Sequence, residues 1–215
     1  MRMDYFNPDR YIGQEQRIIC PVCGSLPRHR ILATWLEAHK AEMQGKILYF
    51  TVEDGMRSWF KRNGIDVTTS DLYAEADLQL NIESTGLEDA SWDWIICNHV
   101  LEHVDDYQKA LRELHRILKP GGRLIISFPI DETLATVKED RNADEKERIR
   151  EFGQIDHWRL FGRDSGDMLR TAGFSVERIT GDGLSESIRP NTGPADYDVN
   201  YLFLCERIED WSMQN

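Results

Sequence analysis

Residues 92–129 constrain the fold of this chain more than any other stretch. An apolar run at 94–97 is followed by a segment with helical spacing and then by a second apolar run. Leu111, Leu114 and Leu118 recur on one face of that segment, which suits a helix packed on a sheet. Two strands joined through such a helix are parallel and connected by a right-handed crossover. The stretch therefore predicts one strand–helix–strand unit of a parallel α/β sheet.

Both ends of the expected helix have residue types that favour a boundary. Asp105 and Asp106 are suited to its start, because a carboxylate there accepts hydrogen bonds from the first-turn amides. The run Pro120-Gly121-Gly122 is expected to end it.

The strings NHVLEHV at 98–104 and LRELHRILKPGG at 111–122 resemble one segment of a known family. They are similar to the fourth strand, the following helix and the fifth strand of class I S-adenosylmethionine-dependent methyltransferases of the type 11 kind. The resemblance extends more weakly over 46–206. It implies an α/β, Rossmann-like fold with a mostly parallel seven-stranded sheet, helices on both faces and an antiparallel last strand. It also implies S-adenosylmethionine as the cofactor.

The chain of 215 residues is long enough for one domain with a sizeable core. We expect an N-terminal arm, a CxxC turn and a cap helix at 1–45, and a methyltransferase-like domain at 46–207. A short tail follows at 208–215. Within the domain, 131–164 is read as an insertion, highly charged at 131–150 and then aromatic. An insertion at this place is predicted to be partly helical and to close over the substrate crevice as a lid.

Charge and hydropathy restrict the partners of the chain. A net charge of −12 argues against a general nucleic-acid binder, because phosphate contacts need a basic face. The opening residues, MRMDYFNPDRY, lack the apolar core of a signal peptide, and no apolar run approaches membrane-spanning length. The sequence predicts a cytoplasmic protein without a membrane partner and leaves the oligomeric state open.

Cys20 and Cys23 form the turn CPVCGS, which is typical of half a zinc site or of a redox pair in a reducing compartment. A structural zinc site needs four ligands, and the chain has no second CxxC pair. Two more ligands would have to come from residues such as His29, His39 and His157. The alternative is a capped turn that holds two free thiols.

The resemblance implies a cofactor loop after a strand at 46–52. In the family, an acidic strand residue is followed by G-x-G-x-G, whose glycines let the backbone approach the cofactor. The matching positions here are Tyr49, Thr51, Glu53 and Gly55, so only the last glycine is present. The loop either binds the cofactor in a different shape or has lost that binding.

Glu53 would place a carboxylate close to the carboxylate of the cofactor, which is unfavourable between like charges. The contact becomes acceptable if a cation intervenes. The candidates for that cation are Arg28, Arg30 and Arg57.

Four further positions match the expected cofactor site. The resemblance implies that Asp71, at the end of the second strand, bonds the ribose hydroxyls, since a carboxylate can accept two hydrogen bonds. Asn81 matches an aspartate that faces the adenine. Asn98 and His99 follow the central strand, where open α/β sheets bind ligands, and are assigned to the boundary of cofactor and substrate. Asp71 as a turn residue and His99 as a loop-orienting residue are the structural alternatives.

Asp156 and His157 lie in the aromatic part of the insertion. The functional interpretation makes Asp156 an orienting carboxylate and His157 a general base. The alternative is a hydrogen-bonded structural brace. Similar GQ-DH-R segments occur, in a subset of methyltransferase-like proteins, together with CPVCGS-RHR segments, which suggests that these two parts of the chain meet.

Three functions are consistent with these observations. The leading hypothesis is a methyltransferase that acts on an oxygen or nitrogen of a small molecule. The second is a protein of the same fold that no longer binds the cofactor and serves as a binding or scaffold module. The third is a zinc-stabilised module that recognises nucleic acid through Arg28, His29 and Arg30, which the net charge of −12 disfavours.

Overall fold

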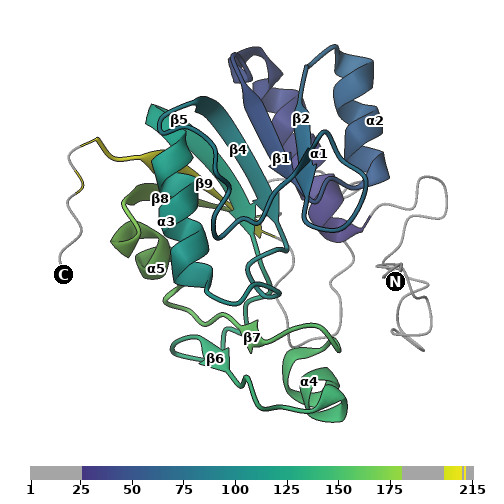
Figure 1. Cartoon of the computed structure of the whole chain (residues 1–215), viewed down its shortest axis with the longest axis vertical. Helices are drawn as coiled ribbons and strands as arrows, with labels where there is room; N and C mark the ends of the chain where they lie inside the picture. The colour runs from purple at the N-terminus through teal and green to yellow at the C-terminus, as the bar shows by residue number, and fades with distance from the viewer. Residues whose placement is uncertain (1–25, 181–200, 210, 212–215) are drawn as a thin grey trace.

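The structure is a computed structural model that describes residues 26–180, 201–209 and 211. Seven strands in these ranges form one sheet in the order β3-β2-β1-β4-β5-β9-β8 (Figure 1). Strand β9 runs antiparallel to its neighbours β5 and β8, and the other neighbouring strands are parallel. The predicted mostly parallel sheet with an antiparallel last strand is confirmed. The strands are β1 (Ile47–Phe50), β2 (Thr68–Asp71), β3 (Leu78–Gln79), β4 (Trp92–Asn98), β5 (Leu118–Ser127), β8 (Phe174–Thr180) and β9 (Tyr201–Arg207).

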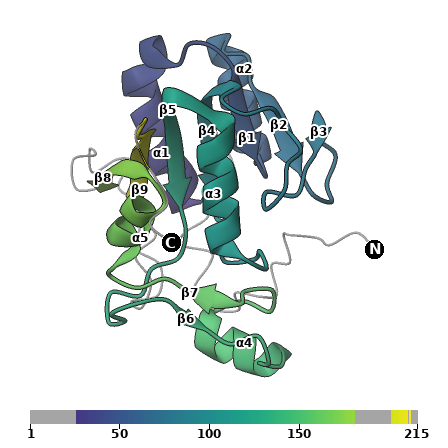
Figure 2. The same cartoon turned by 60° about the vertical axis from the view of Figure 1, so that its left-hand side comes forward.

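Helices cover both faces of the sheet, as predicted. Helices α1 and α2 pack on one face, and α3 and α5 pack on the other (Figure 2). Among the helices that the structure describes, none is both long and apolar enough to cross a membrane. The helices are α1 (Pro27–His39), which continues into a 3-10 turn (Lys40–Glu42), α2 (Asp54–Asn63), α3 (Tyr107–Ile117), α4 (Glu145–Phe152) and α5 (Ser165–Thr171).

The central strands are buried on both faces. In β1, Leu48 and Phe50 pack toward α3, whereas Ile47 and Tyr49 pack toward α1 and α2. Successive side chains of a strand point to opposite faces, so a parallel strand between two helix layers needs a continuous apolar run. This requirement explains why 46–52 and 94–97 are read as apolar runs rather than as alternating patterns.

Helix α3 begins as predicted and ends differently. The side chain of Asp106 caps the helix by accepting a hydrogen bond from the Lys109 amide at 2.9 Å. The prediction that residues 120–122 end the helix is wrong, because those residues already belong to β5. Leu118 is fully buried and pairs with Trp92 of β4 directly after the last helical residue. The helix thus ends where Leu118 is buried and joins β5, two residues before Pro120 and the glycines.

The insertion forms a small separate layer. It contains α4 and a two-stranded antiparallel ladder of β6 (Lys138–Glu139) and β7 (Arg159–Leu160), so the predicted partly helical character is confirmed. In Figure 2 it lies at the end of the sheet toward which β5 points. Ile130, before the insertion, forms a parallel bridge with Phe161, after it. The insertion therefore lies at the carboxyl edge of the parallel strands, where α/β sheets bind ligands.

Replacing Leu114 with alanine is expected to destabilise the protein by about 2–5 kcal/mol, because Leu114 is completely buried between α3 and the sheet. Lys109→Ala on the exposed side of α3 is the matched control and should change stability by less than about 0.5 kcal/mol. Chemical denaturation followed by circular dichroism measures both. Equal effects of the two substitutions would contradict the packing of α3 described above.

Candidate functional site

The loop after β1 makes a left-handed turn at its first residue. Thr51 has φ +55°, a backbone conformation that glycine adopts far more readily than threonine. Its amide donates to the carbonyl of Ser70 at 2.7 Å, which ties the loop to β2. At Gly55, no atom among the described residues stands close to the position that a Cβ would take. The loop therefore keeps a glycine-like turn at Thr51 although the glycine is absent, and Gly55, in the first turn of α2, has open space beside it.

Glu53 is surrounded by cations from α1. Nε2 of His29 lies 2.8 Å from Oε1 of Glu53, and Nε of Arg28 lies 3.8 Å from the same oxygen. Nδ1 of His29 accepts a hydrogen bond from the Leu26 amide at 3.2 Å, so Nε2 is the nitrogen that carries the ring proton toward Glu53. Burial raises the pKa of Glu53, but the contacts with His29 and Arg28 outweigh burial and lower it to about 2. The cation expected beside Glu53 is Arg28, together with His29.

A chain of buried hydrogen bonds connects Glu53 to the central strands. The hydroxyl of Tyr49 donates to Oε2 of Glu53 at 3.0 Å, and Nδ2 of Asn98 donates to the Tyr49 oxygen at 3.4 Å. The Ser127 hydroxyl donates to Oδ1 of Asn98 at 3.0 Å. Burial raises the pKa of Tyr49 well above its ordinary value, so the phenol stays protonated and remains a donor. Predicted site residues Tyr49, Glu53 and Asn98 are thus brought together.

Asp71 and Asn81 both make turns with one side-chain oxygen. Oδ1 of Asp71 accepts hydrogen bonds from the amides of Tyr73 and Ala74, each at 2.8 Å. Oδ1 of Asn81 accepts from the Glu83 amide at 2.8 Å. The turn role that was the alternative for Asp71 is therefore present at Oδ1. Oδ2 of Asp71 has no hydrogen bond within the described residues and is available to a ligand.

The loop after β4 buries a carboxylate. His99 has φ +52°, and its Nδ1 lies 3.0 Å from Oε1 of Glu102. The side chain of Glu102 has no exposed surface, and neither carboxylate oxygen has a hydrogen bond within the described residues. Burial raises the pKa of Glu102, but the neighbouring imidazoles, His99 first, lower it to about 2. Sequence reasoning did not single out Glu102, since glutamates in loops are usually solvated.

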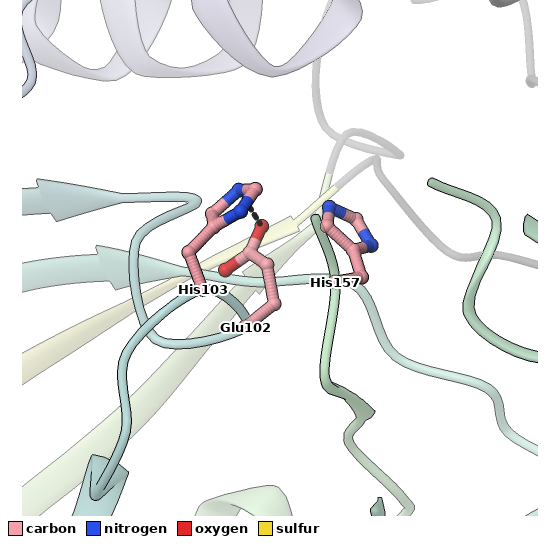
Figure 3. A group of neighbouring side chains, drawn as sticks. All are labelled: Glu102, His103 and His157. Atoms are coloured by element: carbon pink, nitrogen blue, oxygen red, sulfur yellow. Dashed lines mark ion pairs between the residues drawn. The ribbon is translucent and has the colours of Figure 1, made fainter. Parts of the chain in front are cut away.

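His157 lies beside Glu102 and His103, as Figure 3 shows. Its Nδ1 donates to the carbonyl of Phe152 at 2.8 Å. The ring packs edge-on against that of His103, with 4.7 Å between centroids. Burial lowers the pKa of His157 to about 4, so the imidazole is neutral at pH 7. Nε2 is therefore the unprotonated ring nitrogen.

Asp156 does not take the orienting position at Nδ1 of His157, because that nitrogen is bonded to Phe152. Instead, the main-chain carbonyl of Asp156 accepts from Nδ1 of His103 at 3.2 Å, and its carboxylate Oδ2 lies 3.7 Å from the same nitrogen. Asp156 therefore contacts His103, whereas His157 is held by a hydrogen bond to the Phe152 carbonyl.

Arg159 is the residue that connects the insertion to this loop. Its side chain is completely buried, and Nη1 donates to the carbonyls of Leu101 at 2.5 Å and Val104 at 2.7 Å. Nη2 donates to the carbonyl of Asp105 at 3.1 Å, and Nε donates to Glu139 at 2.9 Å. Burial of Arg159 was not predicted from the sequence, since arginine side chains are mostly exposed.

Of the two segments that were expected to meet, CPVCGS lies outside the described residues, so their meeting stays a prediction, whereas the segment after it in the insertion contacts the loop after β4. The main-chain amide of Trp158 donates to the carbonyl of Glu102 at 3.0 Å. Burial, and after it the charge of Arg28, lowers the pKa of His99 on the same loop. The loop after β4 is therefore influenced by the charge of Arg28 from α1 and is bonded to Trp158 of the insertion.

Cys20 and Cys23 lie outside the described residues, so the predicted metal pair stays a prediction. Of the histidines considered as its partners, His29 contacts Glu53, and His157 lies beside Glu102. The third, His39, stacks on the ring of the neighbouring Trp35 at a centroid distance of 4.2 Å. The three candidate ligands thus occupy three different places.

Comparison with known proteins shows similarity to methyltransferases in both sequence and fold. The model of a methyltransferase domain family matches residues 38–126. Over 61 residues the chain is 43% identical to the ubiquinone/menaquinone biosynthesis C-methyltransferase UbiE of Enterobacter sp. (strain 638). That match covers 27% of this chain and 24% of the relative, so the chain spans about a quarter of the relative's length.

Two solved structures show the likeness of fold. The YcgJ protein of Bacillus subtilis has a TM-score of 0.58 at 17% identity, over 84% of this chain and 99% of that one. The 1,6-didemethyltoxoflavin-N1-methyltransferase of Burkholderia thailandensis has a TM-score of 0.55 at 17% identity, over 85% and 79% of the two chains. The latter structure contains 1,6-didemethyltoxoflavin and S-adenosylhomocysteine.

Glu53→Gln is expected to lower the free energy of unfolding at pH 7, because it removes the charge that His29 and Arg28 stabilise. The folded-state pKa of Glu53, about 2, lies below its unfolded value. The contribution is therefore complete above the unfolded pKa of ~4.3 and is lost as the pH falls toward the folded value. A shift of this size corresponds to on the order of 2–3 kcal/mol at neutral pH.

Urea unfolding of wild type and Glu53→Gln between neutral and acidic pH measures this difference. Glu75→Gln, which changes an exposed glutamate, is the control and should alter stability by less than about 0.5 kcal/mol. A difference between wild type and Glu53→Gln that stays constant down to low pH would show that charge is not its cause.

Proposed function

Because this chain belongs to the class I S-adenosylmethionine-dependent methyltransferases, we propose that it transfers a methyl group from S-adenosylmethionine to a small molecule in the cytoplasm. The proposed acceptor atom is an oxygen or a nitrogen. The Burkholderia relative is named for methylation at a nitrogen and UbiE for methylation at a carbon, so relatives of this fold differ in the acceptor. The acceptor of this chain is therefore a matter for direct measurement.

The carboxyl edge of the sheet supports a cofactor site at the proposed residues Thr51, Glu53, Gly55, Asp71, Asn81, Asn98 and His99. The observation that carries the proposal is the free oxygen of Asp71 at the end of β2, where it can accept from ribose hydroxyls. The left-handed turn at Thr51 supplies the backbone shape that the family obtains with glycine.

The methionine end of the cofactor carries a carboxylate, and α1 offers a donor for it. Nε of Arg28 is buried, and within the described residues it has no hydrogen-bond partner. Its ion-pair contact with Glu53 is long, at 3.8 Å. An unsatisfied cationic donor beside the cofactor loop fits a carboxylate ligand, because charge-assisted hydrogen bonds are the strong ones.

Bound S-adenosylmethionine would supply the methyl group from its sulfonium: the acceptor atom would bond to the methyl carbon as the carbon–sulfur bond breaks, and S-adenosylhomocysteine would leave as a neutral thioether. The protein then has to align the acceptor, exclude water and, for a weakly acidic acceptor, take up a proton. The proposed base is His157, whose neutral ring has its unprotonated Nε2 beside Glu102. The predicted role of Asp156 as its orienter is replaced in our proposal by the Phe152 carbonyl, which holds Nδ1.

Calorimetric titration with S-adenosylmethionine and S-adenosylhomocysteine tests the cofactor site. We expect micromolar binding of both, corresponding to about −8 kcal/mol. Asp71→Asn keeps the oxygen that makes the turn and replaces the free one with a donor, so it should weaken binding by about tenfold to a hundredfold. Asp140→Asn changes a similar turn residue in the insertion and should leave the affinity unchanged.

The absence of heat at several temperatures, with no shift in melting temperature, would contradict the cofactor proposal. It would favour the alternative function of a binding or scaffold module. Equal affinities of wild type and Asp71→Asn would retain cofactor binding but remove the ribose assignment from Asp71.

His157→Ala is expected to lower turnover, measured as S-adenosylhomocysteine release with an acceptor found by screening, by roughly a hundredfold or more. Cofactor affinity should be unaffected, because no proposed cofactor contact involves His157. His39→Ala, which removes a histidine stacked on Trp35, is the control. Unchanged turnover of His157→Ala would remove His157 from the reaction.

A further inference from the structure

We propose that Glu102, His103 and His157 form a binding site for a divalent transition-metal ion. One ligand atom from each of these residues lies within 4.8 Å of the other two. The side chains come from the loop after β4 and from the insertion, and in Figure 3 they approach one another. Two imidazole nitrogens and one carboxylate oxygen are a ligand set that zinc and other first-row divalent ions accept.

The hydrogen bonds of the two histidines point their remaining nitrogens to the site. Nδ1 of His157 donates to the Phe152 carbonyl at 2.8 Å, and Nδ1 of His103 donates to the Asp156 carbonyl at 3.2 Å. Because a carbonyl can only accept, each Nδ1 carries a proton, and Nε2 is the nitrogen of each ring that is left to bind an ion. Metal-binding histidines are commonly oriented in this way by a carbonyl or carboxylate at the other nitrogen.

Glu102 provides the independent observation for an ion. Its side chain has no exposed surface, and neither oxygen accepts a hydrogen bond within the described residues. Its ion-pair contacts there are with Nδ1 of His99 at 3.0 Å and Nε2 of His103 at 4.0 Å. Of these two contacts, only the one with His99 is short, and Oε2 has no close cationic partner among the described residues, so this buried carboxylate can also accept a bound cation.

The chemistry of the ligands indicates which ion would bind. Magnesium and calcium prefer oxygen ligands, whereas imidazole suits zinc, cobalt, nickel and iron. Three protein ligands leave a coordination position for water or another oxygen. The site uses Nε2 of His157, so a bound ion and the proposed base role of His157 exclude each other.

Cobalt titration of the full chain, stripped of metal and free of S-adenosylmethionine, tests the site. We expect one Co²⁺ with a visible spectrum of nitrogen and oxygen ligands and without thiolate charge-transfer bands. The double variant Cys20→Ser/Cys23→Ser removes the other candidate metal ligands and should retain this ion. In that background, Glu102→Gln and His103→Ala should each weaken Co²⁺ binding by at least about tenfold to a hundredfold.

Melting temperatures of the metal-free variants separate loss of the site from loss of the fold. Glu102→Gln keeps the volume but removes a charge that the neighbouring imidazoles stabilise, so the metal-free variant is expected to melt below wild type, and its Co²⁺ binding is measured at temperatures at which its circular dichroism is that of the folded protein. The proposal is overturned if stripped protein binds no Co²⁺ at micromolar concentrations. It is also overturned if binding disappears in the cysteine variant or is unchanged by Glu102→Gln.

Cofactor binding is measured on the same samples, so the metal site and the proposed methyl transfer can fail separately. Methyl transfer that is unchanged after metal removal and on adding Co²⁺ back would show that His157 acts as the base and not as a ligand. Activity lost on stripping and restored by Co²⁺ would support the metal site.

Discussion

The buried guanidinium of Arg159 is the contact on which the arrangement of the site depends. It joins the insertion to the loop after β4 through the carbonyls of Leu101, Val104 and Asp105, of which the last two also accept from Arg141 of the insertion. An arginine cannot lose its proton, so its burial is tolerable only while these acceptors stay in place. The loop that carries Glu102 and His103 is thereby held beside the segment that carries His157. The insertion therefore forms one side of the candidate site and is fixed to the loop after β4.

The cofactor loop shows how one change is balanced by others. Tyr49 occupies the strand position at which the family resemblance implies an acid, and its hydroxyl donates to the carboxylate of Glu53 on the following loop. The charge of Glu53 is in turn matched by His29 and Arg28 from α1. A helix outside the parallel-sheet motif has therefore become part of the site, which is consistent with an altered rather than a lost cofactor loop.

The sequence was sufficient for the fold and for part of the site. The periodicity of 92–129 reflects local packing and predicted one strand–helix–strand unit. The family resemblance implied the rest of the sheet and the position of Asp71 at the end of β2. Burial of Glu102 and Arg159 could not be predicted, because it arises between segments as far as 58 residues apart along the chain. Adjacency also misled the prediction for Asp156, since neighbouring residues in a turn point in different directions and Asp156 faces His103.

The parallel bridge between Ile130 and Phe161 has an evolutionary consequence. The insertion begins and ends at this bridge, outside the seven-stranded sheet, so its two ends lie side by side. Exchanging it for another of any length would leave the strand order and the two helix layers intact. The side chains that the insertion contributes to the candidate site can therefore change together, as one unit, without any change in the sheet.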